Sequence, residues 1–80
     1  MLERERKLLS VISRQMSVEG GYVTHRSGTS DDMPIVAEIH GVKQDEAVNI
    51  LKRFGALIET SVSKRTYQIL GYWIYFSLHQ

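Results

Sequence analysis

The sequence has 80 residues, with ten basic and nine acidic side chains, three histidines and no cysteine. A chain of this length forms one small domain, and the absence of cysteine excludes disulfides, thiolate zinc sites and cysteine nucleophiles. We expect a single domain over residues 1–80 in the cytoplasm, with no secretory signal and no run of the ~20 apolar residues that cross a bilayer.

The first predicted element is a helix within residues 1–17. Its apolar residues recur at steps of three and four and therefore line one helix face. They are Leu8, Leu9, Ile12 and Met16. The glycine pair at 20–21 ends the helix, because glycine favours turns. Residues 22–25 have strand propensity, and two interpretations remain open for them: a surface connection, or a small first strand.

A second helix is predicted to begin near Ser30 to Asp32, where either residue can accept a hydrogen bond from a free N–H group of the first turn. Pro34 is tolerated in the first turn because the N–H group that it lacks has no helical partner there. The apolar face of this helix consists of Ile35, Val36 and Ile39. Gly41 is expected to break the helix.

A third helix is predicted over residues 44–54, with Ala47, Ile50, Leu51 and Phe54 at helical spacing. Acidic side chains at 45–46 suit its positive end and basic side chains at 52–53 suit its negative end. Residues 30–55 are therefore predicted to form a helix-turn-helix. Gly55 then closes the third helix in a left-handed conformation.

Residues 57–70 predict a hairpin, because alternating apolar and polar residues flank a polar turn at 63–65. The remaining segment, residues 72–80, is rich in aromatic side chains. Two interpretations of this segment remain open: it completes the core of one chain, or two chains share it in a homodimer. The small core without disulfides and the uncharged aromatic end favour the homodimer, whose expected interface residues are Tyr72, Trp73, Tyr75 and Phe76, because Trp and Tyr are common at interface hot spots. Base stacking is less favoured because no basic residue is interleaved there.

In this order of elements the chain resembles the winged helix-turn-helix superfamily of small regulators. The matching residues are Val36–Lys43, with small Ala37 and the turn Gly41-Val42, followed by residues 47–58. The resemblance covers residues 2–70. It implies an α+β fold with three helices and a small antiparallel β-hairpin wing. It also implies a DNA-binding transcriptional regulator.

Carried over by position, the third helix reads double-stranded DNA in the major groove and the hairpin tip contacts the backbone. Amide side chains pair with adenine edges, whereas Lys and Arg reach guanine or phosphate. The DNA-binding residues implied are Lys43, Gln44, Asn49, Lys52, Arg53, Lys64 and Arg65. Residues 43–65 carry five basic and three acidic side chains, which is a local basic excess.

The rival hypothesis is a winged-helix module that binds protein, as an adaptor or inhibitor, without binding DNA. The net charge of +1, the acidic first turn of the third helix and the aromatic end segment favour it. An enzyme is the least favoured class, and no cofactor is expected. The histidines are far apart in sequence, so a zinc site of His25 and His40 with Asp31 or Asp32 is disfavoured and no metal is predicted.

Overall fold

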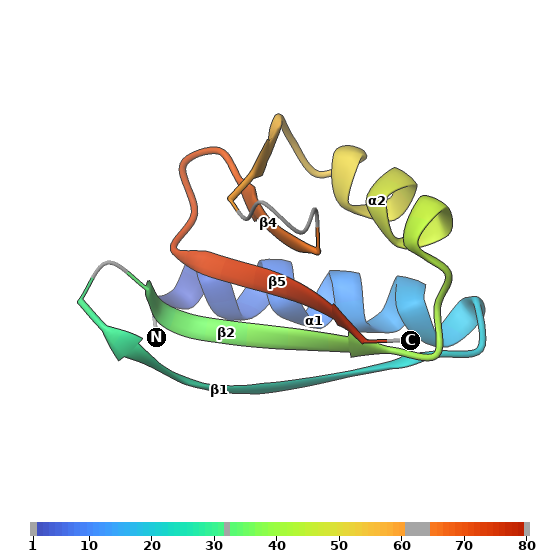
Figure 1. Ribbon diagram of the computed structural model, residues 1–80, viewed down its shortest axis with the longest axis horizontal. Coiled ribbons are helices and arrows are strands. Elements are labelled where there is room, and N and C mark those ends of the chain that lie inside the picture. The colour runs from blue at the N-terminus through green and yellow to red at the C-terminus, as the bar shows by residue number, and fades with distance from the viewer. Residues whose placement is uncertain (1, 32, 61–64, 80) are drawn as a thin grey trace.

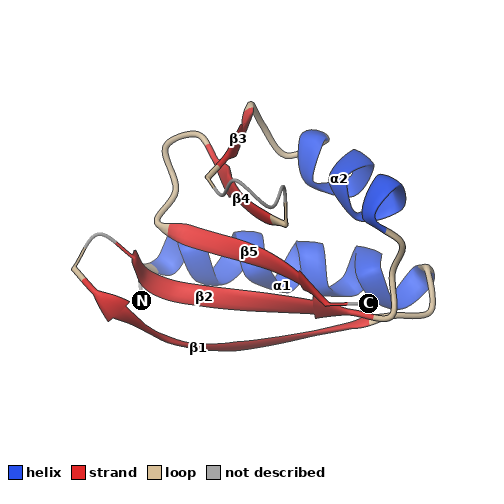
Figure 2. Cartoon of the chain, viewed as in Figure 1, coloured by secondary structure: helices blue, strands red, loops and turns tan. Residues whose placement is uncertain are grey.

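The computed structural model describes residues 2–31, 33–60 and 65–79 (Figure 1). In chain order the elements are α1 (Glu3–Val18), β1 (Tyr22–Ser30), β2 (Met33–His40), α2 (Gln44–Lys52), β3 (Leu57–Glu59), β4 (Thr66–Ile69) and β5 (Ile74–His79). The strands form one five-stranded sheet in the order β1-β2-β5-β4-β3 (Figure 2). Strands β2 and β5 run parallel, and the other neighbouring strands run antiparallel.

Both helices contribute to a single hydrophobic core on one face of the sheet. Helix α1 contributes the predicted apolar residues Leu8, Leu9, Ile12 and Met16 to this core. Helix α2 contributes Ala47, Ile50 and Leu51. The sheet contributes alternate residues of its central strands, among them Ile39 and Phe76, both fully buried. No described helix covers the opposite face, so the domain has two layers and one helix-free sheet face.

The predicted winged helix-turn-helix fold is wrong. The described part of the chain has two helices and a five-stranded mixed sheet, where three helices and a small hairpin were expected. The decisive difference is at residues 33–40, which form β2 rather than a second helix. Without that helix there is no helix-turn-helix unit, and α2 does not have the predicted helix as its neighbour.

The pattern of residues 33–40 fits a strand for a physical reason. Ile35, Ala37 and Ile39 alternate with residues of the other face and all contact the core. Val36, from the opposite face, is also buried. A strand with buried side chains on both faces has apolar residues at adjacent positions, which produces the same spacing as a helical face. The β-branched side chains of this segment then favour the extended form.

The hairpin predicted over residues 57–70 is present as β3 and β4, which pair from Leu57↔Ile69 to Glu59↔Tyr67. It forms one side of the large sheet and not a separate wing, because β4 also pairs with β5. The predicted tip residue Lys64 lies outside the described residues. Within the segment 72–80, β5 is the central strand, between β2 and β4.

Candidate functional site

The two outer strands of the sheet differ in length and protection. Strand β3 has three residues, whereas β1 has nine. Natural proteins protect long edge strands with lysine, proline or strong bulges, because the free N–H and C=O groups of an edge can pair with another chain. Strand β1 contains neither lysine nor proline. Its pairing with β2 is regular from Tyr22 to Ser27, and the register shifts only between Ser27 and Ser30, at the end of the strand. This edge is therefore open to pairing.

A groove runs between the edge strand β1 and helix α1. At one end it is an open pocket of about 500 Å³. Apolar Leu9 and Val23 lie in this pocket beside the hydroxyls of Ser10 and Ser13. His25 lines it as well, together with the side chain of Arg6 from α1. The lining of this part of the groove thus combines apolar and polar side chains.

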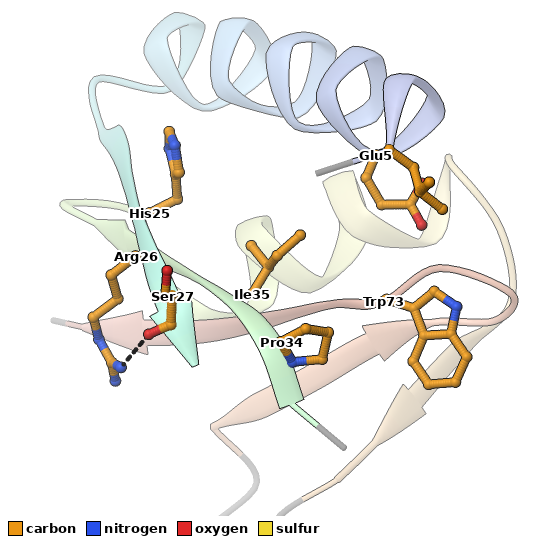
Figure 3. Close-up of a pocket in the computed structure, with 8 residues that line it drawn as sticks. Glu5, His25, Arg26, Ser27, Pro34, Ile35 and Trp73 are labelled. Carbon is orange, nitrogen blue, oxygen red and sulfur yellow. Dashed lines mark hydrogen bonds between the residues drawn. The ribbon is translucent and has the colours of Figure 1, made fainter. Parts of the chain in front are cut away.

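The groove continues into a second open pocket of about 670 Å³, because His25 also lines this one (Figure 3). Here the first turn of α1 faces the ends of β1 and β2. Figure 3 shows Glu5 and Trp73 at one end of this pocket and His25, Arg26 and Ser27 at the other, with Pro34 and Ile35 between them. Leu2 completes the lining.

Glu5 is the one charged side chain buried among the described residues, at 1% exposure. Its Oε2 atom accepts a hydrogen bond from Arg4 Nε at 3.3 Å. Its Oε1 atom is buried and has no hydrogen-bond partner among the residues that the structure describes. An acidic residue is favourable in the first turn of α1 because it lies near the positive end of the helix dipole. This position does not explain why Oε1 is buried, since a buried polar atom without a hydrogen bond costs free energy.

Arg4 connects helix α1 to the loop between β4 and β5. Its guanidinium donates to the carbonyl oxygen of Gly71 and lies 4.7 Å from the centre of the Tyr72 ring. A cation over an aromatic face is attracted by the ring quadrupole. These contacts hold the loop against α1, and the next residue, Trp73, is thereby held at the pocket with 53% of its surface exposed.

The helix-free face carries a polar cluster across β1, β2 and β5. Glu38 contacts Arg26 at 3.2 Å, His40 at 3.8 Å and His79 at 3.9 Å. The rings of Tyr22 and His40 are stacked with centroids 4.7 Å apart, and those of His40 and His79 with centroids 5.0 Å apart. This cluster was not predicted from sequence. It depends on the parallel register that places His40 beside His79.

The contacts of Glu38 are expected to contribute to the stability of the fold. We expect Glu38→Gln to lower the free energy of unfolding by about 0.5–1 kcal/mol at low salt, because one carboxylate serves three partners at a partly exposed site. The loss should shrink near 1 M NaCl, where the Debye length falls to about 3 Å. Urea unfolding at both salt concentrations measures it, with Glu19→Gln at an exposed position as control. Equal free energies of unfolding for the two variants at low salt would show that the contacts of Glu38 do not stabilise the fold.

The structure places most of the predicted DNA-binding residues on or beside α2. Lys43, Asn49, Lys52 and Arg53 are exposed there. Gln44 instead donates from Nε2 to the hydroxyl of Tyr67 at 2.8 Å. Arg65 lies before β4, away from α2 in the sequence, and its carbonyl accepts from the Leu78 N–H at 2.9 Å.

Acidic side chains accompany these basic residues. Asp45 and Glu46 are exposed in the first turn of α2, and a groove beside α2 holds Asp45 and Glu59 as well as Lys52. Carboxylates repel phosphates at close range, so this surface has no simple basic stripe of the kind that nucleic-acid binding favours.

The four predicted interface aromatics are separated in the structure. Phe76 is fully buried in the core, and Tyr72 packs against the core beneath Arg4. Trp73 is exposed at the pocket. Tyr75 lies on the helix-free face at the register position of Val36. Tyr75 and Phe76 are adjacent in β5 and point to opposite faces of the sheet, so the four side chains do not share one face.

Among the described residues, no group of three or more His, Asp and Glu side chains is arranged to hold a metal ion. His40, His79 and Glu38 come nearest, but the two rings are stacked with planes 22° apart. Nearly parallel rings direct their in-plane lone pairs side by side, whereas a zinc ion requires lone pairs that converge. In the described ranges, neither helix combines the length and hydropathy of a transmembrane segment.

Comparisons with protein-family models, with curated proteins and with solved structures gave no match to this chain.

Proposed function

We propose that this domain is a protein-interaction module that binds an extended segment of another protein along β1. The single observation behind this proposal is the regular edge of β1 over residues 22–27, which has neither lysine nor proline, with a groove beside it. An added strand pairs its backbone with such an edge, and its alternate side chains enter the adjacent groove. Backbone pairing supplies affinity and the groove supplies selectivity.

The groove favours a particular kind of segment. Leu9 and Val23 favour a small or medium apolar side chain, and the hydroxyls of Ser10 and Ser13 can hydrogen-bond its polar neighbours. Because side chains along a strand alternate between two faces, every second residue of the bound segment would contact this groove. The partner is thus an extended peptide with an apolar residue at alternate positions.

A second copy of the chain is a poorer partner for β1. Arg26 is the midpoint of the strand Tyr22–Ser30. Full antiparallel pairing of two identical strands about a twofold axis would therefore align the two Arg26 residues. Like charges directly opposite each other destabilise a strand pair. A different segment avoids this repulsion.

Selection of peptides from a random display library on the purified protein tests the proposal. We expect binders with alternating apolar residues, and binding should slow amide hydrogen exchange at alternate residues within 22–27, because every second N–H group of an edge strand points away from its neighbour β2. His25→Lys places a longer charged side chain in the groove and should weaken binding about tenfold or more. Ile58→Lys is the matched control on the opposite edge strand, at an exposed residue, and should leave affinity unchanged.

Three outcomes would overturn the proposal. One is a library that yields no binder, and another is protection that falls on α2 instead of β1. The third is binding of duplex DNA that weakens steeply with salt and is lost in Lys52→Ala and Arg53→Ala. That result would restore the DNA-binding hypothesis on a different fold.

A further inference from the structure

The pocket at the first turn of α1 contains an acidic group whose hydrogen-bonding capacity is incomplete. Glu5 is 1% exposed, and within residues 2–31, 33–60 and 65–79 only its Oε2 atom has a hydrogen-bond partner. We propose that this pocket binds a primary ammonium or guanidinium group, carried by a basic residue of the partner segment. That the cation belongs to a partner segment rests on the proposed function, whereas the affinity of the pocket for a cation does not.

The carboxylate of Glu5 favours a cation as the ligand of this pocket. An ionised carboxylate accepts hydrogen bonds at both oxygens, and bonds from charged donors are the strongest of these. Arg4 occupies Oε2 but is itself directed to Gly71 and Tyr72. The Oε1 atom therefore needs another donor, and an N–H group of a bound cation can supply it.

The walls of the pocket also favour a cation. Trp73 is 53% exposed and Leu2 is 60% exposed at this site, with Pro34 and Ile35 beside them. An indole ring attracts cations, and apolar walls accommodate the methylene stem of a lysine or arginine side chain. Leu2 is the N-cap residue of α1, which places its exposed side chain at the pocket one turn before Glu5.

The other charged groups at the pocket do not favour an anion. Arg26 is paired with Glu38 at 3.2 Å and also donates to the Ser27 carbonyl at 3.3 Å. An anion at the other end of the pocket would face the Glu5 carboxylate. Glu5 and Trp73 lie at the same end (Figure 3), so a carboxylate and an aromatic ring are both available to one cationic group.

The fluorescence of Trp73 provides a direct test, because it is the one tryptophan of the chain. Titration with n-butylammonium should change its emission saturably, whereas isosteric 1-butanol at constant ionic strength should bind about fivefold to tenfold more weakly. Glu5→Gln should remove this preference for the ammonium. Glu3→Gln is the matched control, because it removes an equal charge at an exposed position on the same helix turn, and it should behave like the parent protein.

Equal responses to ammonium and alcohol in the parent protein would overturn the inference, even if Glu5→Gln fails to fold. An ammonium preference that survives in a folded Glu5→Gln variant, checked by circular dichroism, would also overturn it. The two proposals remain distinguishable. Saturable butylammonium binding without any β1-binding peptide would support the pocket and contradict strand addition. Peptides that lack a basic residue but still protect β1 from hydrogen exchange, together with no butylammonium binding, would support strand addition and contradict the cation pocket.

Discussion

Phe76→Ala is expected to lower the free energy of unfolding by about 3–5 kcal/mol, the usual cost of removing a fully buried phenylalanine. Phe76 is fully buried in β5, at the register position of Ala37 on one side and Tyr67 on the other. Truncation would leave a cavity at the centre of the sheet, where neighbouring strands on both sides limit collapse. Urea unfolding followed by circular dichroism measures the loss.

Trp73→Ala is the matched control, because it removes a larger aromatic side chain that is half exposed. We expect it to cost no more than about 1 kcal/mol, since most of its surface stays in contact with water. If Phe76 belonged to an interface between chains, the destabilisation would vary with protein concentration. A loss that is similar in both variants, or that depends on concentration, would contradict the location of Phe76 in the monomer core.

The helices could be predicted from the sequence because their signals are local. The spacing of Leu8, Leu9, Ile12 and Met16 indicates α1, and residues 44–52 have apolar residues at helical spacing with complementary charges at both ends. In each case a few neighbouring residues define the face, and tertiary packing then buries that same face. The hairpin of β3 and β4 follows from equally local alternation.

The second strand could not be distinguished from a helix in this way. Ile35, Val36 and Ile39 fit both periods, and Pro34 is tolerated at the first turn of a helix and also near the beginning of a strand. The deciding interaction is non-local: β2 pairs with β5, which brings Ile35 beside Ile74. Nothing in the local pattern encodes that parallel contact. Periodicity alone therefore predicts a helix at residues 33–40 and, with it, the wrong fold.

The candidate site depends on long-range contacts to an even greater extent. In the sequence Glu5 is indistinguishable from Glu3, since both are acidic residues in one helix turn. Only the fold buries Glu5 and brings it to the pocket that Trp73 lines. The edge of β1 is likewise a property of strand order. Its residues 22–25 suggested a strand, but only the sheet topology makes that strand an outer one.

Gly21→Ala is expected to lower the free energy of unfolding by about 2–3 kcal/mol, as overpacking of a tight contact does. Gly21 lies where the turn after α1 meets the turn after β2. A Cβ atom at this position would overlap the Val42 side chain and the carbonyl oxygen of His40. The carbonyl belongs to the backbone of a central strand and Val42 is buried, so neither neighbour can move away at low cost. Thermal and urea unfolding both measure the effect.

Gly20→Ala separates this steric effect from backbone strain. Gly20 has a positive φ of +84° and open space around its Cα atom, so its substitution should cost only about 1 kcal/mol through the left-handed conformation. A rule based on φ alone would predict the opposite order, because Gly21 does not have a positive φ. Adding Val42→Ala to Gly21→Ala removes one of the two overlaps and leaves the one with His40. We therefore expect the double variant to show favourable coupling between the two sites without full recovery. Additive losses, or a larger cost for Gly20→Ala, would show that the two turns are not in close contact.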